Sequence, residues 1–367
     1  MESLSIESSS GEFGNHSITQ SPNHSMTLTP DMRLLLRLLL LTLLALPSSA
    51  AMWKHHYAEV NGIKLHYVSK GGGKLMLFLH GFPEFWYAWK DQLQEFGKDH
   101  RAVALDMRGY NLSAKPESVE QYAMPFLVDD VKALADQLLP RRGRKKLVLV
   151  GHDWGGVVAW VFAMAHPEYV EKLVIINAPH PGVFGREISS NPEQQKASSY
   201  MLLFRSEQAE TVLSANQYAT LARTVFEGSA RPEAFTEEDR RAYLEAWNQP
   251  GALTGGLNYY RAARVGPPTG PVQSTGGFSP VLRAGSSPGA GGQGPGAGAN
   301  LPSQTVPVPT LVIWGEKDRA LLTGNLEGLD KFVPDLRIQR IPEGTHWIIH
   351  EYPALVNRSI REFLRGR

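Results

Sequence analysis

The fold is decided by VLVGHDWGG, residues 148–156. A run of valine and leucine predicts a buried strand, and Gly151, Asp153 and Gly155 follow where that strand ends and a helix begins. The spacing matches the sharp strand-to-helix turn G-x-S-x-G, with aspartate in the position of the serine. Asp153 is therefore the candidate nucleophile. The alternative is that Asp153 only caps the helix, which explains the aspartate but neither the glycines nor the strand.

The same pattern extends outward from this turn. From Tyr57 onward, short apolar runs alternate with longer amphipathic ones, as in an α/β fold with a mostly parallel central sheet. Strands buried on both faces give continuous β-branched and leucine runs, such as KLVLVG and KLVIIN. The expected strands are residues 75–79, 102–106, 147–150, 173–177, 310–314 and 336–341, and helices are expected at 124–139 and 156–166.

Two stretches interrupt this alternation and divide the core into residues 57–180 and 305–367. Residues 181–265 are helical in character and rich in aromatic side chains, which predicts an inserted helical lid. Residues 266–304 are mostly glycine, proline and serine, which predicts a flexible insert that buries no core. Two interpretations of this insert stay open: a real disordered loop, or the product of a mistaken gene model.

The amino-terminal region precedes the α/β pattern. Residues 1–31 are polar and predict a disordered extension. Residues 32–51 place Arg33 and Arg37 ahead of a leucine-rich run and small residues behind it, which predicts a cleaved signal peptide or a short signal-anchor. This leader favours the secretory pathway or the endoplasmic reticulum membrane. The alternative is a buried or spurious leucine helix. An initiation at Met32 would give a tidier signal, with the first 31 residues an untranslated or misassigned extension.

Composition excludes several classes of function. Lysine and arginine (37) nearly balance aspartate and glutamate (36), so a nucleic-acid partner is not expected. The chain has no cysteine, which rules out disulfides, thiolate zinc sites and cysteine nucleophiles. Other side chains must carry the chemistry.

A second motif, HGFPEFW at residues 80–86, follows an apolar strand. Its tight turn is expected to present the backbone N–H of Phe82 beside that of Trp154. Two such donors form an oxyanion hole, each worth roughly a hundredfold in rate. The alternative is a packing turn without a catalytic role.

The third element consists of VIWGEKDRAL and IPEGTHWIIHEYP. Asp318 and His346 each follow a predicted strand, so both are expected at the carboxyl edge of the sheet, where ligands bind. His346 would take a proton from water while Asp318 orients the ring. The alternative is that His346 is only a surface histidine. The competing candidates for the histidine and the acid are His350 and Asp106.

The motifs HGFPEFW, LDMRGY, GHDWGG, WGEKD and GTHW together resemble the α/β-hydrolase-fold epoxide hydrolases, over residues 57–364 apart from the insert. This resemblance implies two lid tyrosines that hydrogen-bond the epoxide oxygen. SSYMLLF supplies Tyr200 and GLNYYRA supplies Tyr260, with Tyr259 and Tyr218 as competitors. Tyr200 rests on the looser match, and its alternative role is that of a core aromatic residue.

The resemblance also implies the reaction. Asp153 would form a covalent ester with a small lipophilic epoxide, and water activated by His346 would release a vicinal diol, with no metal or organic cofactor. The alternatives are a haloalkane or haloacetate dehalogenase and a catalytically silent ligand-binding protein on the same fold. One departure is Asn111, since the family usually has glycine after RGY.

Overall fold

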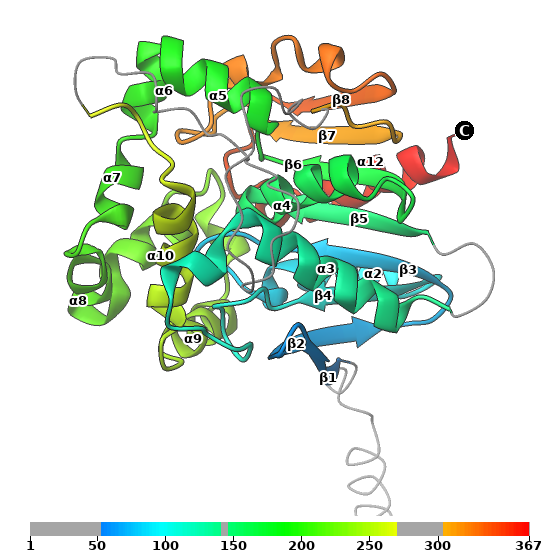
Figure 1. The fold of residues 1–367 in the computed structure, drawn as a ribbon, viewed down its shortest axis with the longest axis horizontal. Coiled ribbons are helices and arrows are strands. Elements are labelled where there is room, and N and C mark those ends of the chain that lie inside the picture. The colour runs from blue at the N-terminus through cyan, green and yellow to red at the C-terminus, as the bar shows by residue number, and fades with distance from the viewer. Residues whose placement is uncertain (1–52, 141–145, 270–303, 367) are drawn as a thin grey trace, which may run out of the picture. The chain divides into compact units, whose positions relative to one another are not determined.

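Eight strands form one sheet in the order β1-β2-β4-β3-β5-β6-β7-β8, parallel from β4 to β8 (Figure 1). The computed structural model describes residues 53–140, 146–269 and 304–366. The strands are β1 (Lys54–Val60), β2 (Ile63–Lys70), β3 (Lys74–Leu79), β4 (His100–Leu105), β5 (Leu147–His152), β6 (Val170–Ile176), β7 (Thr310–Gly315) and β8 (Leu336–Ile341). The expected α/β fold and its six predicted strands are confirmed.

Strands β1 and β2 were not predicted. They form an antiparallel hairpin, and β2 also pairs antiparallel with β4. The connection is Asn61-Gly62, with φ of 49° and 77°. Left-handed backbone at both positions is what a two-residue hairpin turn requires, and Asn-Gly is the dipeptide that supplies it most readily. The Asn-Gly pair is therefore the sequence signal for this hairpin.

Helices cover both faces of the sheet. In Figure 1, α3 and α4 lie in front of it, and α2 and α12 behind it. Strand β5 is buried at every position, as expected for a central parallel strand between two helical layers. The core helices are α2 (Lys90–Phe96), α3 (Met124–Leu138), α4 (Asp153–Ala165), α11 (Ile348–Glu351) and α12 (Pro353–Arg365), with short turns η1 (Trp86–Trp89), η2 (Val119–Tyr122), η5 (Thr323–Leu326) and η6 (Leu329–Lys331).

The stretch between β6 and β7 that was expected as a lid is helical. It contains α5 (Pro181–Ser190), α6 (Pro192–Ala197), α7 (Tyr200–Arg205), α8 (Ala209–Ala222), η3 (Arg223–Glu227), η4 (Pro232–Ala234), α9 (Glu237–Trp247) and α10 (Ala252–Ala263). A capping box between Thr236 and Asp239 starts α9. Helix α8 is broken where Asn216, Gln217 and Tyr218 adopt left-handed backbone, so it follows a bent path.

Several predicted segments lie outside the described residues: the extension at 1–31, the leader at 32–51, and most of the insert at 266–304. In the part of the chain that is described, no helix combines the length and the apolar character needed to cross a bilayer.

Candidate active site

The elbow carrying Asp153 is strained and crowded. Asp153 is the first residue of α4 and has a φ of 50°, a conformation that costs a non-glycine residue about 1–3 kcal/mol and persists only where the surroundings enforce it. A Cβ at Gly81 would lie 2.2 Å from Asp153 Oδ1, so only glycine fits there. The Phe82 backbone N–H donates to Asp153 Oδ1 at 2.8 Å. The turn thus presents the carboxylate beside a fixed donor.

Trp154, the second predicted donor, follows Asp153 in the first turn of α4. The first N–H groups of a helix have no partner within it, so the Trp154 amide is available to a developing oxyanion. The indole packs edge-on against Tyr260, with ring centroids 5.2 Å apart.

His346 stands between the two carboxylates. Its Nδ1 lies 2.7 Å from Asp318 Oδ2, and its Nε2 lies 3.6 Å from Asp153 Oδ2. The Asp318 hydrogen bond places the proton on Nδ1 and directs Nε2 towards Asp153. The structure therefore brings together Asp153, His346 and Asp318, three residues that the sequence separates by up to 193 positions (346 − 153).

Asp318 is held as a buried carboxylate. Its Oδ1 accepts the backbone N–H groups of Ala320 and Leu321 at 2.8 and 3.0 Å, and its Oδ2 accepts the Asn177 amide at 2.8 Å. Burial raises the pKa of Asp318, but His346 and these donors outweigh it and lower the pKa. Asn177 ends β6, and sequence reasoning missed it, since an asparagine after a strand carries no distinctive signal.

The pKa of His346 follows from the charges around it. Burial lowers this pKa, but the carboxylates of Asp318 and then Asp153 outweigh it and raise the pKa to about 9. His346 is therefore an imidazolium in the resting site at neutral pH. Neutralising Asp153, as an ester would, removes one of the two nearest negative charges and so lowers the pKa of His346. The ring then loses its proton more readily, and the neutral imidazole can accept a proton from water.

Replacing Asp153 with asparagine is expected to lower the pKa of His346 below about 9, because a negative charge 3.6 Å from Nε2 disappears. Asp318→Asn should lower it further, since Asp318 is the larger of the two influences. Titration of the histidine side chains by NMR measures both shifts. An unchanged His346 pKa in the two variants would contradict this account of the site.

Tyr200 and Tyr260 lie at the same cavity as the nucleophile. They line one cavity of about 420 Å³ together with Asp153, and their ring centroids are 6.4 Å apart. Burial, and in second place the charge of Asp153, raises the pKa of Tyr200 well above its ordinary value. Burial likewise raises the pKa of Tyr260. Both phenols stay protonated at neutral pH and available as donors.

The residues that the sequence offered as alternatives for the site form hydrogen bonds with other groups. The Tyr259 hydroxyl donates to the Arg108 carbonyl at 2.8 Å, and that of Tyr218 to the Trp247 carbonyl at 3.1 Å. Asp106 accepts from the Trp86 backbone N–H at 2.8 Å and pairs with His66 at 2.6 Å.

Sequence reasoning also missed a buried network behind His346. Glu84 Oε2 lies 3.0 Å from His152 Nδ1, and Oε1 lies 2.7 Å from both His350 Nε2 and the Tyr243 hydroxyl. His152 Nε2 in turn contacts the His346 carbonyl oxygen at 2.8 Å. Burial raises the pKa of Glu84, but the two histidines hold it well below its ordinary value. The signal was present, because Glu84 and His152 lie within the two quoted motifs.

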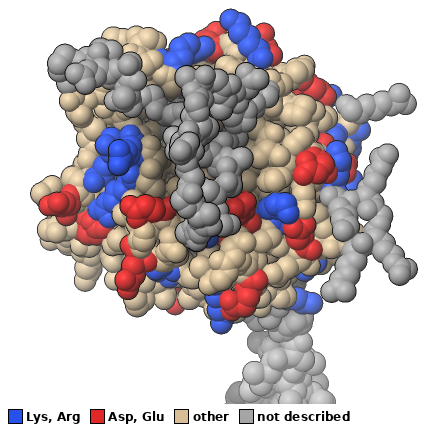
Figure 2. Space-filling model, in the orientation of Figure 1, with Lys and Arg blue, Asp and Glu red and all other residues tan. Residues whose placement is uncertain are grey.

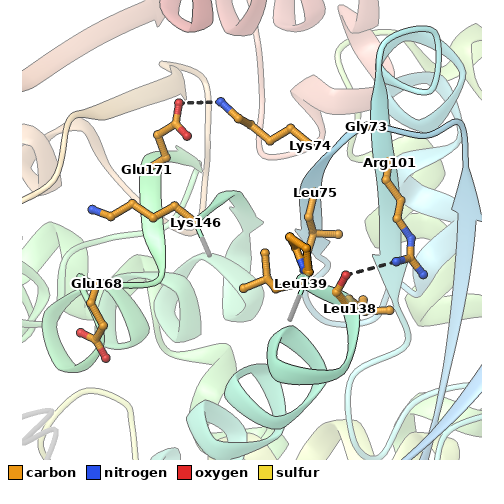
Figure 3. A pocket seen from close by; sticks show the side chains of 10 residues that line it. Gly73, Lys74, Leu75, Arg101, Leu138, Leu139, Lys146, Glu168 and Glu171 are labelled. Atoms are coloured by element: carbon orange, nitrogen blue, oxygen red, sulfur yellow. Dashed lines mark hydrogen bonds and ion pairs between the residues drawn. The ribbon is translucent and has the colours of Figure 1, made fainter. Parts of the chain in front are cut away.

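A larger cavity of about 1360 Å³ lies at the opposite ends of the strands. Lys74 and Leu75 begin β3, Glu171 lies near the start of β6, and an ion pair of 2.8 Å joins the lining residues Lys74 and Glu171 (Figure 3). Arg101 donates to the Leu138 carbonyl at 3.2 Å. None of the predicted site residues lines this cavity.

Two further properties bear on ligands. Acidic and basic side chains are interspersed on the face drawn in Figure 2, in keeping with the near-neutral formal charge. Within residues 53–140, 146–269 and 304–366, no group of three or more histidine, aspartate or glutamate side chains is arranged to hold a metal ion.

Fold and site together define a hydrolase with a carboxylate at its elbow. Residues 74–353 match the family model described as alpha/beta hydrolase fold, and the chain belongs to that family. Within it, the chain belongs to the epoxide hydrolases. It is 36% identical to Epoxide hydrolase 4 of Mus musculus over 85% of this chain and 79% of that protein.

Two other proteins are matched over nearly their whole length. The chain is 39% identical to the AB hydrolase superfamily protein YfhM of Bacillus subtilis, over 86% of this chain and 99% of that one. A crystal structure of Bacillus megaterium epoxide hydrolase in complex with an inhibitor superposes with a TM-score of 0.73 at 35% identity, covering 85% of this chain and 100% of that chain.

Proposed function

We propose that this protein hydrolyses an epoxide to a vicinal diol through a covalent ester on Asp153. The observation that carries the proposal is that one cavity is lined by the carboxylate of Asp153, the His346 imidazole and the phenols of Tyr200 and Tyr260. Opening a strained ether requires a nucleophile on carbon and an acid at oxygen. These side chains supply both.

The first step joins the substrate to the enzyme. An oxygen of Asp153 attacks one epoxide carbon, and the bond between that carbon and the ring oxygen breaks. Tyr200 and Tyr260 hydrogen-bond the departing oxygen, and one of the two phenols gives it the proton that makes it a hydroxyl. The tyrosinate left behind is restored by the proton that His346 takes from water in the second step, passed on through solvent. The product of this step is a hydroxyalkyl ester, and Asp153 no longer carries a negative charge.

The second step releases the diol. His346, its ring oriented by Asp318, removes a proton from water, and the hydroxide attacks the carbonyl carbon of the Asp153 ester. The Phe82 and Trp154 N–H groups stabilise the resulting oxyanion. Collapse of the tetrahedral intermediate breaks the ester bond, frees the diol and restores the Asp153 carboxylate.

A single turnover in heavy-oxygen water with a styrene oxide tests this mechanism. Mass spectrometry should find the heavy oxygen in the Asp153 peptide, while the first diol stays unlabelled, because the oxygen delivered to carbon comes from the carboxylate. Label in the first diol would mean direct attack by water on the epoxide. Absence of any diol would shift the assignment to dehalogenation or to ligand binding without catalysis.

Removing either lid phenol is expected to slow ester formation. Tyr260→Phe and Tyr200→Phe should each reduce the single-turnover rate roughly 10- to 100-fold, with a larger loss in the double variant, because a hydrogen-bond donor to the leaving oxygen disappears. Tyr218→Phe is the control, since its hydroxyl serves the Trp247 carbonyl. Equal rates in Tyr260→Phe and Tyr218→Phe would exclude the role given to Tyr260.

The substrate that we propose is a lipophilic epoxide, such as that of a fatty acid. Phe82, Phe204, Leu221 and Trp347 line the cavity and support an apolar ligand. The predicted leader supports an association with membranes, in the secretory pathway or at the endoplasmic reticulum, where lipid epoxides partition. Comparable rates on short water-soluble epoxides, and none on fatty-acid epoxides, would overturn this substrate class.

A further inference from the structure

The cavity at Asp153 has an apolar interior and a polar mouth. Phe82, Leu213, Leu221 and Trp347 line it and are buried. Three of its lining residues are instead exposed to solvent, and they mark the place where the cavity opens: Thr224, Lys317 and Arg319. Two of these three residues carry a positive charge.

The two cations at this mouth differ in their partners. Lys317 pairs through its ammonium group with the Glu343 carboxylate. Arg319 forms no ion pair or side-chain hydrogen bond within the part of the chain that the structure describes. The Thr224 hydroxyl is used, since it donates to the Thr220 carbonyl at 2.8 Å. Arg319 is therefore the polar group at the mouth that is free to bind a ligand.

Charges inside the site determine which ligand group Arg319 can serve. The carboxylates of Asp153 and Asp318 line the same cavity with the His346 imidazolium between them, which leaves one net negative charge. An anionic substituent close to the epoxide ring is therefore repelled. An anionic substituent at the far end of an apolar chain avoids this repulsion and reaches the mouth. A guanidinium suits it, because its planar donors match a carboxylate in a two-point hydrogen bond.

We propose that Arg319 selects epoxides that carry an anionic group, such as a carboxylate, separated from the epoxide ring by an apolar chain. The proposal rests on the proposed function and adds to it a residue that distinguishes charged from neutral substrates of the same length. Arg319 acts on binding and orientation and takes no part in the bond changes at Asp153.

The test compares a long-chain fatty acid bearing a terminal epoxide with its primary amide. Arg319→Gln should lower kcat/KM for the acid by about fivefold, the size of a solvent-exposed ion pair, and leave the amide unchanged. Arg319→Glu should lower it further, because attraction becomes repulsion. Added salt should weaken the effect of Arg319→Gln, since exposed charges are screened. Arg358→Gln, an exposed arginine on α12 that does not line the cavity, is the matched control.

The outcomes separate this proposal from the proposed function. If Arg319→Gln changes acid and amide equally, or neither, the selectivity role is wrong although epoxide hydrolysis stands. If the wild-type protein turns over neither these substrates nor styrene oxide, the proposed function fails. Calorimetry with the saturated fatty acid and its amide then still decides whether Arg319 binds the anion: selective weakening of acid binding in Arg319→Gln supports it, and equal affinities overturn it.

Discussion

Replacing His346 with glutamine is expected to stop the reaction after its first step. Asp153 should still attack an epoxide, because the histidine acts on water and not on the nucleophile, whereas hydrolysis of the ester loses its general base. General-base catalysis contributes roughly 10²–10⁴-fold, so steady-state turnover should fall by about that factor. Mass spectrometry of the intact protein should show one substrate added per chain, and digestion should locate it on the Asp153 peptide.

The control is His166→Gln, because His166 lies at the end of α4 and is partly exposed, away from the Asp153 cavity. It should turn over substrate at the wild-type rate and accumulate no adduct. An inactive His346→Gln protein that traps no adduct with any accepted epoxide would mean that His346 takes part in the first step as well, and the division of roles between Asp153 and His346 would be wrong.

Asp153→Asn is expected to have the larger effect. Loss of a catalytic nucleophile costs roughly 10⁶-fold in kcat where it has been measured, and an amide oxygen is a far weaker nucleophile than a carboxylate. Asparagine tolerates the left-handed backbone at this position, with its φ of 50°, so the elbow should stay folded. Turnover rates are measured in the presence of excess styrene oxide, and affinity for a diol product is measured by calorimetry. Together the two measurements separate catalysis from binding.

Asp330→Asn, an exposed aspartate in η6, serves as the matched control and should retain full activity. The Asp153→Asn protein should bind the diol with near-wild-type affinity, because the cavity walls and both tyrosines remain. Turnover close to that of the control would remove Asp153 from the nucleophile role, and a loss of diol binding would point to a damaged fold.

Asn111 shows how tertiary structure explains a departure in the sequence. The position after RGY has a φ of 40°, which favours glycine and, among other residues, tolerates asparagine best. The Asn111 amide also donates to Asp106 Oδ2 at 2.7 Å and is buried. The substitution therefore fits the turn and gains a hydrogen bond.

Residues with a strong local signal were predictable, and residues defined by distant partners were not. The six parallel strands and the elbow at Asp153 follow from patterns a few residues long. The hairpin of β1 and β2 also had such a signal in Asn61-Gly62. Asn177 had none, because its role depends on Asp318, which is 141 positions further along the chain.

The sequence by itself determined the α/β fold, the tight turn at Asp153 and the residue types near the sheet edge, since strand burial and glycine-dependent turns are properties of neighbouring residues. Tertiary structure alone decided that His346 Nε2 lies 3.6 Å from Asp153, that Glu84 lies between His152 and His350, and that Arg319 stands at the cavity mouth. The physical reason is range: hydrogen bonds and ion pairs depend on separations of a few ångströms, and only the packing of remote segments sets those separations.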